Sequence, residues 1–215
     1  MSLLIHKTIL EFNDVLASKE PAPGGGSTSA LSGLLATSLT MMVVNLTVGK
    51  KSFEVLDKSI KDKILEDFET MKKLNSELSH LVDEDTKAFL LFMEAMKLPK
   101  TNEEEKGKRA EALESASVHA LKVPLMVAEK CLLILKHQMV IAEYGNKNAV
   151  SDVGVGALMA KSGLEGAVLN VKINLPGIGD DQLKHDAQLK VESFQNEGTR
   201  LNTEIMRMVN RRIEG

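Results

Sequence analysis

Between Pro21 and Gly49 the chain carries no charged residue, although charged residues make up 27% of the 215-residue sequence. From Ser32 onward six polar residues interrupt this stretch, whereas a transmembrane helix takes about 20 predominantly apolar residues. The stretch therefore predicts a helix that is buried on nearly all sides, with a partner subunit as one source of cover. The polar residues are Ser32, Thr37, Ser38, Thr40, Asn45 and Thr47.

The rest of the chain has the periodicity of amphipathic helices. Thr8 with Glu11 predicts a capping box at the start of a first helix, and Thr101 with Glu104 predicts another. Ser27 is the expected N-cap of the uncharged helix, which Gly49 closes. From Phe53 to Lys97 apolar residues recur at helical spacing, with a change of phase that suggests a break near Asp83.

Further helices are expected over residues 102–142, where Pro124 should kink or divide the segment, and over residues 151–170. Asp180 can cap a last amphipathic helix that runs through Met208. No convincing alternating β segment occurs. The pattern predicts an all-α protein, with residues 4–213 forming a single-domain bundle of long helices.

Two of these segments carry stripes of small residues, one around Gly33 and one from Gly154 to Ala167. Glycine within a helix costs about 1 kcal/mol relative to alanine, so close packing or ligand access should compensate. Tight helix–helix packing is the favoured interpretation, with ligand contact open at one end of the same helices.

Composition excludes several functional classes. Aromatic residues are only 3% and the net charge is −3, which argues against a base-stacking or polyanion-binding nucleic-acid module. Cys131 is the only cysteine, lies in an apolar run and fits a packing role in a reducing cytoplasm. The five histidines lack metal-site spacing, so no metal is expected. They are His6, His80, His119, His137 and His185.

Three features could carry chemistry. The loop from Pro23 to Ser27 is rich in glycine and precedes a helix N-terminus, where backbone N–H groups can meet an anion or a carbonyl. Asp83 and Asp85 cannot share one helix face, so at most one is expected to point toward apolar neighbours, which would raise its pKa. On the pattern alone, a solvated acidic turn is the favoured interpretation of this cluster. Asp152 and the Lys50-Lys51 pair are read first as helix-end residues.

In this order, the motifs resemble the cyclodeaminase/cyclohydrolase family of folate enzymes. This is the family of the C-terminal domain of the bifunctional formiminotransferase-cyclodeaminase, which also occurs as stand-alone bacterial proteins. Each motif is weak alone, but the ordered set covers essentially the whole chain. The motifs are residues 21–27, 48–51, 82–85 leading to 97–100, 123–125, Gly145-Asn146 with Ser151-Asp152, and 170–175.

The resemblance implies an all-helical homodimer joined through its small-residue helices, with folate sites near the subunit interface. It implies a 5-formiminotetrahydrofolate cyclodeaminase, a carbon–nitrogen lyase, and/or a 5,10-methenyltetrahydrofolate cyclohydrolase, with a tetrahydrofolate derivative as substrate and no cofactor. Asp85 matches the catalytic position, with Asp83 and Asp152 as supporting carboxylates. The implied substrate-binding residues are Pro23, Gly24, Gly25, Gly26, Ser27, Lys50, Lys51 and Asn148.

Other readings remain open. A separate formiminotransferase chain could supply the formimino substrate; otherwise the cyclohydrolase would be the main activity. A non-catalytic helical scaffold that only dimerises would explain the small-residue stripes equally well. A membrane-associated protein rests on the Pro21–Gly49 stretch alone and is not favoured. Neither a membrane nor a nucleic acid is an expected partner.

Overall fold

A computed structural model describes residues 3–215, and every regular element in this range is helical. The α-helices are α1 (Ile9–Leu16), α2 (Gly25–Thr47), α3 (Lys51–Glu54), α4 (Lys58–Lys97), α5 (Glu103–Tyr144), α6 (Val150–Asn174) and α7 (Asp181–Glu214). Short 3-10 turns cover Leu4–His6, Lys147–Ala149 and Leu175–Gly177. The predicted all-α class is confirmed.

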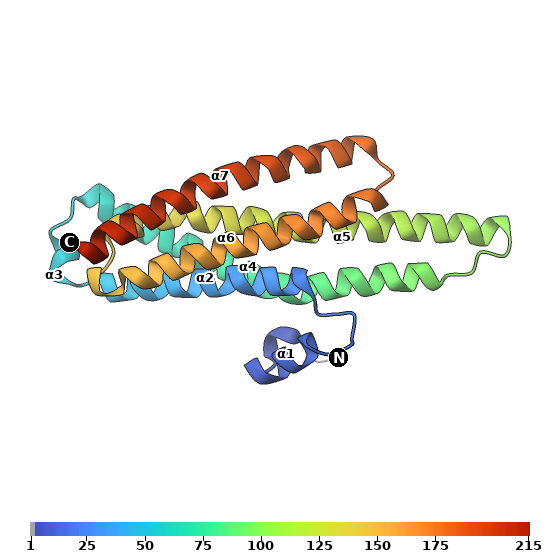
Figure 1. Cartoon of the computed structure of the whole chain (residues 1–215), viewed down its shortest axis with the longest axis horizontal. Coiled ribbons are helices and arrows are strands. Elements are labelled where there is room, and N and C mark those ends of the chain that lie inside the picture. The colour runs from blue at the N-terminus through green and yellow to red at the C-terminus, as the bar shows by residue number, and fades with distance from the viewer. Residues whose placement is uncertain (1–2) are drawn as a thin grey trace.

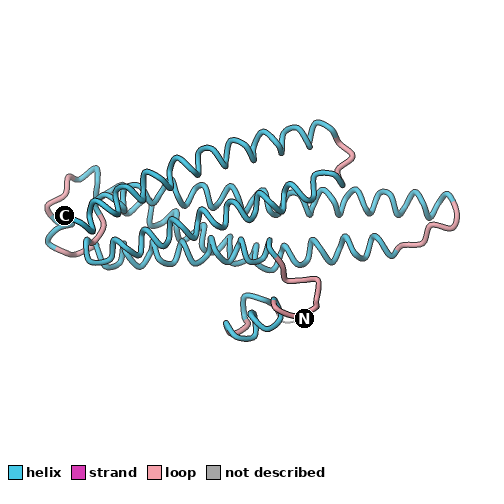
Figure 2. Tube along the Cα trace, in the orientation of Figure 1, coloured by secondary structure: helices cyan, strands magenta, loops and turns pink. Residues whose placement is uncertain are grey.

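The long helices lie roughly along one axis and form an elongated bundle (Figures 1 and 2). The uncharged helix α2 packs against α4, α5 and α6, and α7 packs on α5 and α6. The hairpin between α4 and α5 extends well past the N-terminal end of α2, while the short helix α1 stands away from the bundle. Within one chain the bundle therefore covers α2 only in part, because Leu35, Met42 and Leu46 stay exposed, and the predicted burial on nearly all sides is not reached.

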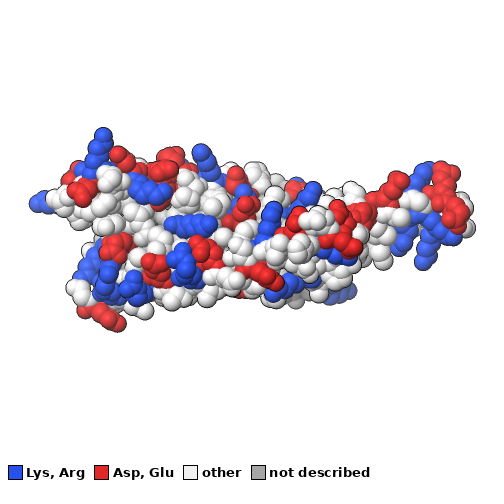
Figure 3. Space-filling model, turned by 90° about the horizontal axis from the view of Figure 1, so that it is seen from above, with Lys and Arg blue, Asp and Glu red and all other residues white. Residues whose placement is uncertain are grey.

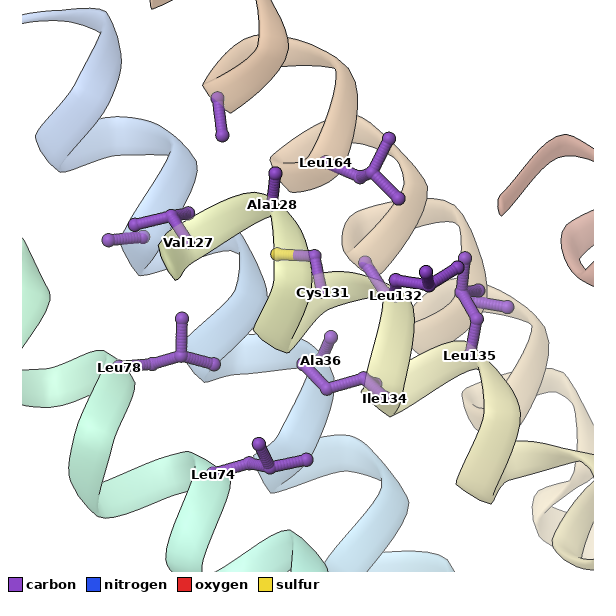
Figure 4. Packing of buried hydrophobic residues seen from close by; sticks show 14 of the residues in the cluster. Ala36, Leu74, Leu78, Val127, Ala128, Cys131, Leu132, Ile134, Leu135 and Leu164 are labelled. Atoms are coloured by element: carbon purple, nitrogen blue, oxygen red, sulfur yellow. The ribbon is translucent and has the colours of Figure 1, made fainter. Parts of the chain in front are cut away.

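Cys131 lies in the core where helices α2, α4, α5 and α6 meet (Figure 4). Leu78 of α4, Ala36 of α2 and Leu164 of α6 surround it, and all three are fully buried. Burial raises the pKa of the Cys131 thiol to about 12. The prediction that this thiol has a packing role is confirmed.

Glycines let the middle of α6 approach the N-terminal part of α2 closely. A Cβ atom on Gly163 would lie 2.8 Å from the Ser29 carbonyl oxygen and 2.9 Å from Cys131 Sγ. Ser32 donates a hydrogen bond of 2.8 Å to the Met159 carbonyl. Tight packing therefore accounts for the small residues at this level, as favoured from the sequence.

Several helix ends differ from the predictions. The Thr8–Glu11 capping box and the Asp180 cap are confirmed. Ser27, however, is not an N-cap, because α2 already begins at Gly25 with Gly24 in the cap position. The second predicted box, Thr101 with Glu104, does not form: Asn102 is the N-cap and accepts from the Glu105 backbone N–H.

Two long helices are continuous where interruptions were expected. Helix α4 passes through Asp83 without a break. Helix α5 contains Pro124 and is not divided there. Helix α6 continues four residues beyond the predicted end at Asn170, which places Asn174 on the same helix.

Charge is distributed unevenly over the bundle. The face that carries α7 shows acidic and basic side chains interspersed (Figure 3), whereas α2 has none. Within the described residues, α2 is the one helix long and apolar enough to cross a membrane. In this fold it is packed against three other helices.

Candidate active site

A cavity of about 460 Å³ opens where the N-terminus of α2 meets α4, α5 and the C-terminal end of α6. This volume lies within the range of small-molecule sites. The cavity is lined by Pro21, Ala22, Gly24, Gly25, Gly26, Asp85, Ala88, Phe89, Phe92, Ser117, Ala120, Asn170, Ile173, Asn174 and Gly177. The glycine-rich loop and Asp85, which the sequence singled out separately, thus meet in one place.

Asp85 is held by the first turn of α2. Its Oδ2 accepts hydrogen bonds from the Ser27 backbone N–H (2.9 Å) and the Ser27 hydroxyl (3.2 Å). Ser27 itself is fully buried and also pairs with the Thr86 hydroxyl. The other carboxylate oxygen, Oδ1, has no hydrogen-bond partner among residues 3–215, so it is available to a ligand.

Burial raises the pKa of Asp85 above its usual value, and the two hydrogen bonds from Ser27 partly oppose that rise. A carboxyl group whose pKa moves toward neutrality exchanges protons more readily at working pH. The expectation of a carboxyl group with a raised pKa in apolar surroundings therefore fits Asp85.

Gly26 determines how closely the loop approaches this carboxylate. A Cβ atom at position 26 would overlap Asp85 Oδ1 and Cγ and would lie 2.6 Å from Oδ2. Any side chain at this position would therefore displace the carboxylate. Pro23 is buried beside the loop and follows a cis peptide bond.

Two types of side chain on the other walls were not assigned to the site from the sequence. Phe89 and Phe92 come from α4 and supply two of the six phenylalanines of the chain. Asn170 and Asn174 come from the last turns of α6. Because the predicted helix ended at Asn170, the i,i+4 relation that places both amides on one face was not apparent.

Asp83 does not belong to this cavity. It is 8% exposed, and its carboxylate accepts from the backbone N–H groups of Leu4 (2.5 Å) and Ile5 (3.3 Å). The prediction that the two aspartates face different ways is confirmed. The supporting role expected for Asp83 has no geometric basis here, since its oxygens hold the N-terminal segment.

Four other predicted site residues lie at the opposite end of the bundle. Lys50 and Lys51 follow the C-terminus of α2, whose 23 residues place them roughly 33 Å from Gly25. The turn that contains Asn148 is fastened to the same end, because the Asn146 N–H donates to Thr47 Oγ1 (2.8 Å). Asp152 lies in the first turn of α6 beside it. One chain does not bring these four residues to the cavity.

No group of three or more His, Cys, Asp or Glu side chains is gathered for metal binding in the part of the chain that the structure describes. The polar side-chain groups of the cavity are one carboxylate, two amides and a serine hydroxyl, and Gly24, Gly25 and Gly26 add backbone groups. This set suits proton transfer and hydrogen bonding to an organic ligand.

This chain is similar in sequence and in fold to known proteins. A methenyltetrahydrofolate cyclohydrolase of Methylorubrum extorquens is 36% identical over 97% of this chain and 98% of its own length. A formimidoyltransferase-cyclodeaminase of Sus scrofa is 34% identical over 90% of this chain, which spans only 35% of that longer protein. The crystal structure of formiminotetrahydrofolate cyclodeaminase from Thermotoga maritima superposes with a TM-score of 0.81 at 26% identity, covering 95% of this chain and 96% of that one.

The sequence profile of one family, described as formiminotransferase-cyclodeaminase, matches residues 8–193. That range includes the glycine-rich loop, Asp85 and both cavity asparagines. The chain therefore belongs to the formiminotransferase-cyclodeaminase family.

Proposed function

We propose that this chain is a folate one-carbon enzyme that acts on the bridge between N5 and N10 of tetrahydrofolate, with Asp85 as its general acid and base. The observation that carries the proposal is the Asp85 carboxylate. One of its oxygens is fixed by Ser27 and the other is open to a cavity of small-molecule size. The names of the full-length bacterial relative and of the structural neighbour support the same chemistry.

As a cyclodeaminase, the enzyme takes 5-formiminotetrahydrofolate. The formimino group enters as its protonated amidinium, N5–CH=NH2+, so that its nitrogen already carries two hydrogens. N10 attacks the formimino carbon while Asp85 Oδ1 accepts the N10 proton. Asp85 then returns that proton to the departing nitrogen, the C–N bond breaks, and ammonia leaves 5,10-methenyltetrahydrofolate. The carboxylate also lies close enough to stabilise the cationic amidinium electrostatically.

As a cyclohydrolase, the enzyme takes 5,10-methenyltetrahydrofolate. Water attacks the methenyl carbon and Asp85 accepts a proton from it. The C–N5 bond then breaks as N5 takes the proton back from Asp85, the hydroxyl proton of the intermediate is released to solvent, and 10-formyltetrahydrofolate forms. Both reactions place a positive charge on the same carbon–nitrogen bridge, so one carboxylate serves both.

The remaining walls suit a folate. Phe89 and Phe92 offer flat apolar surfaces to an aromatic or pterin ring. The cavity binds the folate as substrate, and the proposed reactions draw on no further cofactor. A separate formiminotransferase would supply the formimino substrate. The name of the longer Sus scrofa relative includes this transferase beside the cyclodeaminase.

We also propose a cytoplasmic homodimer that packs through α2 and α6. Both helices expose apolar side chains, among them Met42 and Leu46 on α2 and Leu158 and Leu169 on α6. If two copies pack antiparallel, the end of the bundle with Lys50 and Lys51 of one copy approaches the cavity of the other. These lysines would then meet the anionic glutamate tail of the folate, since ammonium groups favour carboxylates.

The dimer proposal is tested by light scattering on the wild type and on Leu158→Glu. We expect a dimer for the wild type and a folded monomer for the variant, with a higher KM for the folate substrate. A dimeric Leu158→Glu protein with unchanged KM would contradict this interface.

The activity is tested by the absorbance of 5,10-methenyltetrahydrofolate. Its formation from 5-formiminotetrahydrofolate and its loss by hydrolysis are followed in separate assays, with Asp85→Asn as the control. We expect turnover in at least one direction and its loss in the variant. If a folded wild-type protein leaves both traces equal to buffer, the chain is a non-catalytic helical scaffold.

A further inference from the structure

Within the proposed folate site, on which this inference rests, we infer that Asn170 and Asn174 determine substrate specificity. Their side-chain oxygens accept hydrogen bonds from N–H groups of the reduced pterin ring. The two asparagines lie four residues apart on α6 and both line the cavity. Side chains at this spacing occupy the same helix face, with Cβ atoms about 5–6 Å apart.

The orientation of the Asn170 amide is fixed by its own helix. Its Nδ2 donates a hydrogen bond of 2.8 Å to the Gly166 carbonyl oxygen. A carbonyl oxygen only accepts, so the nitrogen must face Gly166 and Oδ1 must point the other way. A Cβ atom on Gly25 would lie 3.3 Å from Nδ2 and 3.8 Å from Oδ1, which places this amide against the glycine-rich loop.

Asn174 is oriented in the same manner by a different helix. Its Nδ2 donates to the Ala120 carbonyl oxygen of α5 at 2.8 Å. Neither Oδ1 accepts a hydrogen bond from any other side chain or backbone group in residues 3–215. The two amide oxygens are therefore acceptors presented to the cavity.

These acceptors, together with Asp85 Oδ1, make acceptors predominate among the side-chain groups of the cavity, which also contains the Ser117 hydroxyl and the backbone of the glycine-rich loop. A matching ligand carries several N–H groups and tolerates a nearby negative charge. A reduced pterin ring has N–H groups at N3 and N8 and an amino group on C2, and the methenyl bridge is cationic. A ligand lacking these hydrogens would leave the acceptors unpaired, which is costly in a desolvated site.

The test compares Asn170→Leu and Asn174→Leu with the wild type in the methenyltetrahydrofolate assay. Leucine keeps the volume and removes the acceptor. We expect KM to rise at least about tenfold with kcat within about threefold, since the lost contact exists before and during the reaction. Asn75→Leu is the control, because Asn75 is a half-buried α4 asparagine that donates to Thr37 outside the cavity.

Asn170→Asp separates recognition from structural support. It loses the hydrogen bond to Gly166, as Asn170→Leu does, but keeps acceptor oxygens. We therefore expect a smaller rise in KM for Asn170→Asp than for Asn170→Leu. Equal rises, unchanged KM in both leucine variants, or an equal rise in Asn75→Leu would overturn the inference.

The wild-type result distinguishes the two proposals. A wild type without turnover that also fails to bind tetrahydrofolate would remove the proposed function itself. A wild type with normal turnover whose asparagine variants keep its KM would remove only the role of the asparagines.

Discussion

The surroundings of Asp83 and Asp85 differ completely, although the two residues are separated by one position on the same helix. Asp83 is buried against the N-terminal segment, and both of its oxygens accept backbone N–H groups. Asp85 lines the cavity, uses one oxygen to fasten the first turn of α2 and has no hydrogen-bond partner on the other among residues 3–215. The comparison shows that burial alone does not distinguish a structural carboxylate from a reactive one. What distinguishes them is the Asp85 oxygen, Oδ1, that has no hydrogen-bond partner among residues 3–215.

The first prediction applies the same exchange at both positions. Asp85→Asn should lower turnover at least about a hundredfold, because the general acid and base is lost. Asp83→Asn should keep turnover within about threefold of the wild type. Steady-state assays measure the turnover of both variants. Similar losses of turnover at the two positions would contradict the different roles assigned to Asp83 and Asp85.

Thermal unfolding of these variants adds a second contrast. The folded chain binds the Asp85 proton more tightly than the unfolded chain, since burial raises this pKa. Ionised Asp85 therefore lowers stability as pH rises through its folded pKa. Asp85→Asn removes that charge, so its Tm at neutral pH should equal or exceed the wild-type value.

The second prediction concerns the gap that Gly26 leaves for the carboxylate. Gly26→Ala should rotate Asp85 away from Ser27 and lower kcat roughly tenfold to a hundredfold, since small displacements of a catalytic group are costly. Gly107→Ala is the matched control, because a Cβ there meets nothing within 4 Å. Full activity in Gly26→Ala would show that the fixed position of Asp85 is dispensable.

The third prediction tests how strongly Asp83 holds the N-terminal segment. Asp83→Ala should lower the free energy of unfolding by about 2 kcal/mol, because two hydrogen bonds to a carboxylate are lost. Urea denaturation measures the change, and hydrogen exchange of the Leu4 and Ile5 amides locates it. Unaltered protection of these amides would mean that the N-terminal segment is held by other contacts.

The fourth prediction concerns the smallest expected effect, a shift in the pH dependence of activity. The Ser27 hydroxyl helps to lower the pKa of Asp85, so Ser27→Ala should raise that pKa further. The acidic limb of kcat/KM against pH should then move to higher pH. Ser32→Ala removes another α2 hydroxyl, one that donates to Met159, and should leave the limb in place. A shift to lower pH would reverse the assigned role of the hydrogen bond.

Sequence periodicity was sufficient for the fold class and for most helices, because each long helix has a continuous apolar face or, in α2, no charge at all. The sequence could not show which aspartate meets the cavity, since the partners of Asp83 lie 78 and 79 residues away. It also grouped Lys50 and Lys51 with the glycine-rich loop. The length of the helix between them separates the two by roughly 33 Å.

The burial of α2 has a consequence for how this chain is made. Its cover includes α6, and Ser32 and the Met159 carbonyl that it binds are 127 residues apart in sequence. At about 5–20 residues per second, a ribosome needs roughly 6 to 25 seconds to add that many residues. During each round of synthesis the nascent chain therefore presents an uncharged helix before its last cover exists. In that interval chaperones compete with aggregation for the growing chain.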